Sequence, residues 1–193
     1  MDRITNIVSD KGGFVSKGTL SGRAQYERVR RATKRGELIK VKRGVYAEPS
    51  QMMNTMIDID LIVPGGVVCL YSAWSYYQLT TTIPPAYCVA IEAKRKVSTP
   101  STIPVQLYYW KNDNLDFGIT KQIIAGYTVK ITDIERSVCD AVKYRNKIGI
   151  DICTEVIRNY LKRSDRNISR LMNYASKLRV AKTLSMYLQM GIE

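Results

Sequence analysis

The chain has 193 residues, 45% of them hydrophobic, so it can form a core and is long enough for two small domains. Thirty Lys and Arg against 17 Asp and Glu give a net charge of +13, which is typical of proteins that bind a polyanion, nucleic acid first and an anionic membrane surface second. The sequence has no histidine, which excludes Ser-His-Asp and Cys-His catalysis and every His-ligated zinc site.

The first 48 residues predict three helices followed by a basic β-hairpin. The expected helices are one around Ile4, Ile7 and Val8 that ends at Gly12-Gly13, a short one over 17–20 with Ser16 as N-cap, and one over about 22–35 between Ser21 as N-cap and Gly36. Residues 38–47 suit two short strands, and Gly44 can take the positive φ that their turn demands. This order is typical of a winged helix-turn-helix.

Residues 49–193 predict a mixed α/β domain that ends in a helical segment, which makes the whole chain α+β. The domain boundary is expected near Glu48-Pro49. The expected elements are a helix over 51–60, a buried helix over 66–79, strands over 87–92, 105–110, 123–124 and 127–131, and about four helices from Asp133 onward, with breaks near 148–149, 165–167 and 179–180. Asp133 and Ser169 have the chemistry of helix N-termini.

The third helix places a basic face opposite its apolar face. On a helical wheel Val29, Ala32 and Thr33 lie toward the core, and Lys and Arg cover most of the open side. In a winged helix this helix enters the major groove, where Arg can read guanine and Gln can read adenine, while the hairpin holds a phosphate or the minor groove. The predicted DNA-binding residues are Arg23, Gln25, Glu27, Arg28, Arg30, Arg31, Lys34, Arg35, Lys40, Lys42 and Arg43. A solvated basic helix, or a winged helix that binds protein or RNA, is the alternative.

The charge is unevenly distributed along the chain. Residues 1–48 hold 12 Lys and Arg against five acids, and residues 49–193 hold 18 against 12. A second concentration lies between Lys143 and Lys182, with 11 basic and three acidic residues. It is either a solvated helical face or a second phosphate-facing patch, whose candidates are Lys143, Arg145, Lys147, Arg158, Lys162 and Arg163.

Three blocks of sequence, in order, resemble the AbiEi family of type IV toxin–antitoxin antitoxins. The first is 35–46 (RGELIKVKRGVY), the second is 64–80 (PGGVVCLYSAWSYYQLT) with its continuation over 83–91, and the third joins 135–140 (ERSVCD) to 144–149 (YRNKIG). The chain departs from the family where Val29 and Ala32 stand in a helix that often carries Leu.

The resemblance implies a cytoplasmic repressor and antitoxin of an abortive-infection system that acts in phage defence. Such a protein binds inverted repeats in the promoter of its own operon. Its C-terminal domain opposes a nucleotidyltransferase-like toxin, as a rule without a stable complex. No enzymatic activity, metal or cofactor is expected.

Two other functions stay open on the sequence alone. One is a plain winged-helix regulator whose C-terminal domain senses a ligand or partner. The other is a DNA-targeted nuclease, because Glu92 and Lys94 have the spacing of half a metal-dependent site and Asp58 and Asp60 could supply an acid. The Asp-x-Asp spacing also fits nucleotidyltransferases, but the Gly-Ser pair that they need upstream does not occur in the sequence.

The compartment is inferred from cysteines and hydropathy. The cysteines stand far apart without a Cys-x-x-Cys pair, so core packing in a reducing compartment is expected for Cys69, Cys88, Cys139 and Cys153. No secretory signal is visible, and the longest apolar stretch, 61–79, is interrupted by Pro and Gly. We therefore expect a cytoplasmic protein with no membrane span.

Overall fold

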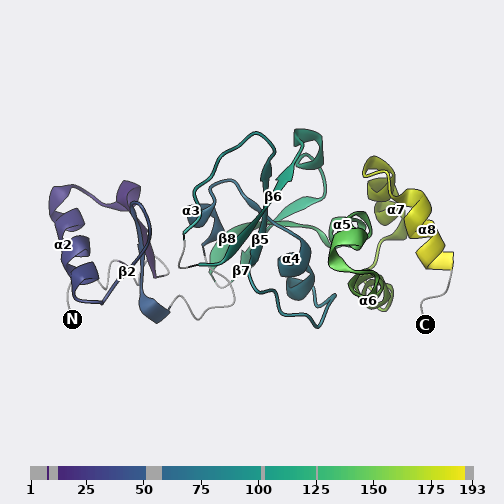
Figure 1. Ribbon diagram of the computed structural model, residues 1–193, viewed down its shortest axis with the longest axis horizontal. Helices are drawn as coiled ribbons and strands as arrows, with labels where there is room; N and C mark the ends of the chain where they lie inside the picture. Colours follow the sequence, from purple (N-terminus) through teal and green to yellow (C-terminus); the bar gives the residue numbers. More distant parts are fainter. Residues whose placement is uncertain (1–7, 9–12, 51–57, 101–102, 125, 190–193) are drawn as a thin grey trace. The chain divides into compact units, whose positions relative to one another are not determined.

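The computed structural model describes residues 8, 13–50, 58–100, 103–124 and 126–189 (Figure 1). The fold is α+β, as predicted, and it contains two sheets. The chain divides into two compact units. Unit 1 comprises Met1–Gly66, Lys96–Val105 and Gln122–Val129, and unit 2 comprises Val67–Arg95, Gln106–Lys121 and Lys130–Glu193.

Unit 1 contains a small antiparallel sheet and one long helix. Its elements are β1 (Phe14–Ser16), the 3₁₀ helix η1 (Lys17–Thr19), α2 (Arg23–Lys34), β2 (Ile39–Lys42), β3 (Val45–Ala47) and α3 (Ile59–Ile62). The strand order is β1-β3-β2, so the expected hairpin is confirmed and gains a third strand. That strand is the apolar Phe14-Val15 link, which pairs opposite Tyr46 and Ala47 of β3. The predicted first helix and the helix over 51–60 lie mostly outside the described residues.

The α2 helix packs one apolar face against this sheet, which Figure 1 shows in purple and blue. Val29 and Ala32 are fully buried, as the helical wheel predicted, and they share a cluster with sheet residues such as Tyr46. The helix begins one residue later than expected, with Gly22 as N-cap. Ser21 does not cap the helix through its side chain; its backbone N–H donates to Gln25 Oε1 instead.

A five-stranded sheet lies mainly in unit 2, in the order β6-β5-β4-β8-β7. Its strands are β4 (Val67–Val68), β5 (Tyr87–Glu92), β6 (Val105–Trp110), β7 (Ile119–Ile124) and β8 (Tyr127–Thr132). The β4 strand pairs antiparallel with β5 and parallel with β8. The four strands predicted from their Val, Ile, Tyr and Trp content are confirmed, with β7 beginning four residues earlier than expected.

The bounds predicted for the buried helix, 66–79, are wrong at both ends. Val67 and Val68 form β4, and the helix α4 runs only over Leu70–Tyr76. The two valines are β-branched, and their pairing with two neighbouring strands outweighs the helical pattern that follows them. Beyond the helix, Gln78 adopts a positive φ of 57° and turns the chain.

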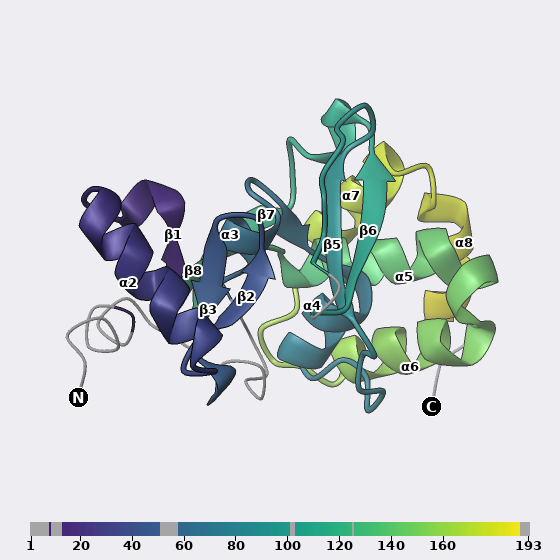
Figure 2. The ribbon, with the colours of Figure 1, turned by 60° about the vertical axis from the view of Figure 1, so that its left-hand side comes forward.

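The C-terminal segment of unit 2 is helical, as predicted. Its helices are α5 (Ile134–Ile148), α6 (Ile150–Leu161), α7 (Ile168–Lys177) and α8 (Ala181–Gln189). Asp133 is the N-cap of α5, and its carboxylate accepts from the Arg136 N–H at 2.8 Å. Ser169 lies in the first turn of α7, near the helix N-terminus that its chemistry indicated, and Asn167 is the N-cap. Figure 2 shows α5 with α6, α7 and α8 around it, and α5 contacts all three.

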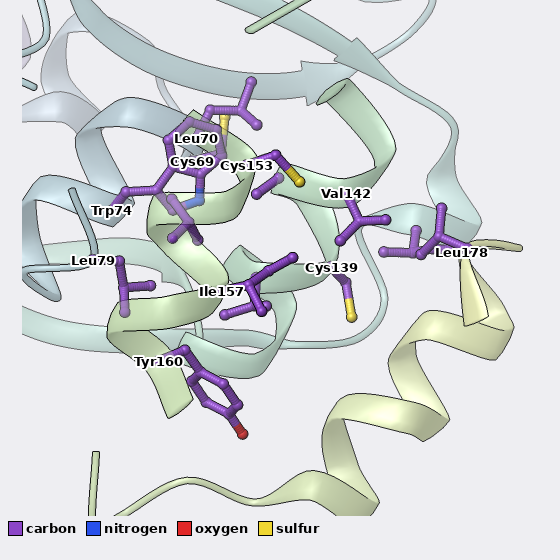
Figure 3. Packing of buried hydrophobic residues seen from close by; sticks show 14 of the residues in the cluster. Cys69, Leu70, Trp74, Leu79, Cys139, Val142, Cys153, Ile157, Tyr160 and Leu178 are labelled. Carbon is purple, nitrogen blue, oxygen red and sulfur yellow. The ribbon is translucent and has the colours of Figure 1, made fainter. Parts of the chain in front are cut away.

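The core of unit 2 forms where α5, α6 and α4 meet (Figure 3). Trp74 is fully buried there and donates its indole N–H to the Ser137 carbonyl at 2.9 Å. All four cysteines are buried and free, as predicted: Cys69, Cys88, Cys139 and Cys153. Among the helices of the described residues, none is long and apolar enough to cross a membrane.

Candidate nucleic-acid interface

The exposed face of α2 carries cations that have no acidic partner within the described residues. The backbone enters α2 through Gly22 and leaves it after Arg35, so a twelve-residue helix presents one continuous outer face. Four predicted DNA-binding residues are exposed on it and form no ion pair with the residues that the structure describes: Arg23, Arg28, Arg31 and Lys34. Unpaired guanidinium and ammonium groups on one helix face form the arrangement that binds phosphate oxygens and guanine edges.

Other predicted residues of α2 are engaged within the chain. Gln25 accepts a hydrogen bond from the Ser21 N–H at 2.8 Å, so its carbonyl oxygen stabilises the start of the helix. Arg30 lies 3.8 Å from Glu27, a long and exposed pair that DNA could displace. Just beyond the helix, Arg35 forms a two-point pair with Glu37, with N···O distances of 2.7 and 3.0 Å.

The hairpin after α2 supplies two exposed cations and one engaged one. Lys40 and Arg43 are exposed and lack an acidic partner among the residues described. The Lys42 Nζ instead donates to the Ile62 carbonyl at 2.7 Å, and partial burial lowers the pKa of its amine. Lys42 therefore holds β2 to α3, which leaves it less suited to the phosphate contact predicted for it.

The turn of the hairpin has the predicted geometry. Gly44 has a φ of 78°, a left-handed conformation in which a residue with a Cβ would be strained. A β-bulge precedes the turn, because Lys40 pairs with Tyr46 while Lys42 pairs with Val45. Val41 is the extra residue of the bulge, and its side chain is buried. The bulge interrupts the regular alternation of side chains between the two faces of the sheet at Lys40 and Lys42.

One cation that the sequence prediction did not include lies beside this turn. Lys17 opens η1, is exposed, and donates its backbone N–H to the Gly44 carbonyl at 2.7 Å. A helical pattern does not signal this contact, because it joins residues from two separate elements.

The candidates for a second basic patch have mixed surroundings. Lys143 and Lys162 are exposed, and the Lys147 ammonium lies 5.9 Å from the ring centroid of Tyr144. Arg145 donates to the Val142 carbonyl, Arg163 pairs with Asp165 at 2.8 Å, and the Arg158 Nε is buried without a hydrogen-bond partner in the described chain. Their role in binding nucleic acid stays a prediction.

The residues considered for a nuclease have structural roles or lie apart from a metal-binding group. Asp58 caps α3 by accepting from the Leu61 N–H, and Asp60 accepts from the Gly65 N–H. Glu92 and Lys94 are exposed at the end of β5. Within the residues that the structure describes, no cluster of three or more Cys, Asp or Glu is arranged to hold a metal ion.

A protein-family model described as "Transcriptional regulator, AbiEi antitoxin" matches residues 2–49. Over these residues, about a quarter of the chain, the predicted resemblance is confirmed. The matched segment contains β1, η1, α2 and the hairpin, and thus every cation of the candidate interface. No curated protein matches the chain.

Proposed function

We propose that this protein is a DNA-binding antitoxin regulator that represses its own operon. Its N-terminal 48 residues form the DNA-binding domain, a winged helix-turn-helix. The observation that carries the proposal is the set of exposed cations on α2 and the hairpin, within the segment similar to AbiEi regulators. A solvated helix could also carry such charges, but the family similarity favours a polyanionic partner.

In this proposal α2 lies in the major groove and the β2–β3 hairpin is the wing. Arg23 and Arg28 in the first half of α2 suit base edges, because the N-terminal part of a recognition helix enters deepest. Arg31 and Lys34 further along α2, and Lys40 and Arg43 on the wing, suit phosphates of the duplex. One module reads one half-site, so two copies of the chain occupy an inverted repeat.

The residues after Pro49 carry the antitoxin activity in this proposal. The family match ends at residue 49 and does not cover this region. The support for this part of the proposal is the resemblance of the two later sequence blocks, within 64–91 and 135–149, to AbiEi antitoxins. The partner is a nucleotidyltransferase-like toxin encoded beside the gene, opposed without a stable complex, and the chain itself performs no catalysis. The exposed cations Lys143 and Lys162 belong to a surface through which this region contacts nucleic acid.

The experiment separates repression from neutralisation. The full chain and an Arg31→Ala/Lys34→Ala variant are expressed beside a reporter driven by the DNA upstream of the gene, and separately beside the adjacent toxin gene. We expect the variant to lose repression and to keep growth rescue, because the two substitutions lie on the DNA-binding helix only. Full repression by the variant would contradict the DNA-binding proposal. Loss of rescue with intact folding would contradict the division of labour.

A plain winged-helix regulator is the second candidate. It is favoured by one observation, that the family similarity covers the regulator segment and not the remainder. Repression without any rescue from a neighbouring toxin would place this candidate first.

A further inference from the structure

The wing turn of unit 1 is held against η1 by contacts at Lys17. Besides the hydrogen bond from the Lys17 N–H to the Gly44 carbonyl, a Cβ built on Gly44 would lie 3.5 Å from the Lys17 Cβ. The base of the Lys17 side chain therefore faces the wing turn at Gly44. It is fixed to the wing at its base although it belongs to another element.

The other end of the Lys17 side chain lies over the recognition helix. Its Nζ is 5.9 Å from the ring centroid of Tyr26, which is the residue of α2 one turn before Arg30. Lys17 is exposed, and no acidic group pairs with it in the described chain. A cation over a tyrosine ring keeps its charge and its three N–H donors available for an anion.

Lys42 provides the contrast within the wing itself. Its ammonium donates to the Ile62 carbonyl at 2.7 Å and is only partly exposed. Lys42, on strand β2 of the wing, is therefore engaged by α3. Lys17, on η1, lies between the wing turn and α2.

We propose that Lys17 is a phosphate-binding residue of the DNA interface, positioned between recognition helix and wing, and that Lys42 is a tether that positions the wing without contacting DNA. The proposal rests on the proposed function, because it assigns residues to the same DNA surface. A duplex that receives α2 in one groove and the wing beside it passes its backbone between them, where Lys17 places a charge. Its ligand is the phosphodiester of duplex DNA of any sequence.

The test measures the salt dependence of binding to a fluorescently labelled duplex of mixed sequence by anisotropy, over a series of KCl concentrations. Full-length chains carrying Lys17→Ala, Lys17→Arg, Lys42→Met or the control Lys111→Ala are compared, and the thermal midpoint of each is recorded. Lys111 is exposed and bears the same single charge on a turn of unit 2. Each lost phosphate contact lowers the slope of log K against log salt by about 0.9.

We expect Lys17→Ala to lower that slope by about 0.9 with an unchanged thermal midpoint, and Lys17→Arg to restore it. Lys42→Met should lower the thermal midpoint and leave the slope unchanged, and Lys111→Ala should change neither. A Lys17→Ala slope equal to that of the wild type overturns the inference, as does a Lys42→Met slope lowered by a full contact while the variant is folded. Failure of the wild type to bind the duplex at low salt would instead overturn the proposed function.

Discussion

Arginine is used in opposite ways in the two units. Arg31 of α2 is exposed and has no acidic partner in the described chain, whereas Arg136 of α5 is fully buried. The Arg136 guanidinium donates to Asp140 at 3.1 Å and to the carbonyls of Asn114 and Phe117, and lies 4.6 Å from the ring centroid of Trp110. The same side chain therefore stabilises the fold in unit 2 and is left available for a partner in unit 1.

The buried pair is expensive to desolvate. Burial raises the pKa of Asp140 to about 6, although the charge and hydrogen bond of Arg136 oppose the shift. The cost is offset because the guanidinium donates to the Asp140 carboxylate and to two backbone carbonyls and lies over the rings of Trp110 and Phe117. Pairing and burial, more than residue type, therefore separate the structural arginines of this chain from the candidate DNA-binding ones.

The largest effect is expected from Arg136→Ala. Removal of the guanidinium leaves the Asp140 carboxylate buried without its partner, which should lower the free energy of unfolding by about 3–5 kcal/mol. Arg30→Ala is the matched control, since its side chain is 59% exposed and lies 3.8 Å from Glu27, and it should cost below about 1 kcal/mol. Urea unfolding followed by circular dichroism measures both. Equal losses would remove the distinction between the two kinds of arginine.

The next effect concerns the glycine that packs on Arg136. Gly118 has a φ of 64°, and a Cβ there would lie 2.6 Å from the Arg136 Cβ, so Gly118→Ala combines backbone strain with a clash. Gly36 has a φ of 77° and open space around it, so Gly36→Ala carries the strain alone, about 1–2 kcal/mol. We expect Gly118→Ala to cost about 1–3 kcal/mol more than Gly36→Ala in urea unfolding. Similar losses would show that the loop over 111–118 yields to the added methyl group.

A third prediction concerns specificity on the exposed helix. Arg23→Ala and Arg28→Ala should weaken binding to a site selected from random DNA by roughly 1–3 kcal/mol, because each would lose a two-point contact to a base. Binding to unselected DNA should change little, as measured by competition. Equal losses on both kinds of DNA would make these arginines phosphate contacts.

The smallest effect is a pH-dependent one in unit 2. Burial raises the pKa of Glu155, but hydrogen bonds from the Thr81 N–H and from the Thr80 and Thr81 hydroxyls outweigh it, so the net pKa is lowered. The folded state thus binds this proton less readily than the unfolded state, and the stabilisation is present above the unfolded pKa and disappears as the pH falls through the folded pKa. Glu155→Gln should cost roughly 1 kcal/mol at neutral pH and little at acidic pH. If Glu155→Gln lowers the free energy of unfolding equally at neutral and acidic pH, the effect comes from the packing of the side chain and not from its charge.

The sequence predicts best what depends on neighbours along the chain. The buried face of α2, the Asp133 cap and the breaks between the C-terminal helices follow from helical spacing and capping chemistry. The pairing of Arg136 with Asp140 fits their spacing of four residues on one helix, but nothing in that spacing signals that the pair is buried.

What the sequence does not predict depends on contacts between distant segments. The β4 strand exists because β5 and β8 flank it, and two β-branched residues are too short a signal to separate it from the helix that follows. Similarly, the Lys42 contact with Ile62 spans 20 residues, and the Lys17 contact with Gly44 joins two elements. A charge count treats Lys17, Lys40 and Lys42 as equivalent, and only the tertiary fold distinguishes them.

The exposed cations of unit 1 are proposed to bind duplex DNA. This proposal is tested by comparing the salt dependence of binding of the wild type with that of a variant in which Arg31, Lys34, Lys40 and Arg43 are all replaced by Ala. If each side chain neutralises one phosphate, the slope of log K against log salt should fall by about 0.9 for each of the four, while circular dichroism stays unchanged. A folded variant that binds DNA with the wild-type slope would contradict the claim.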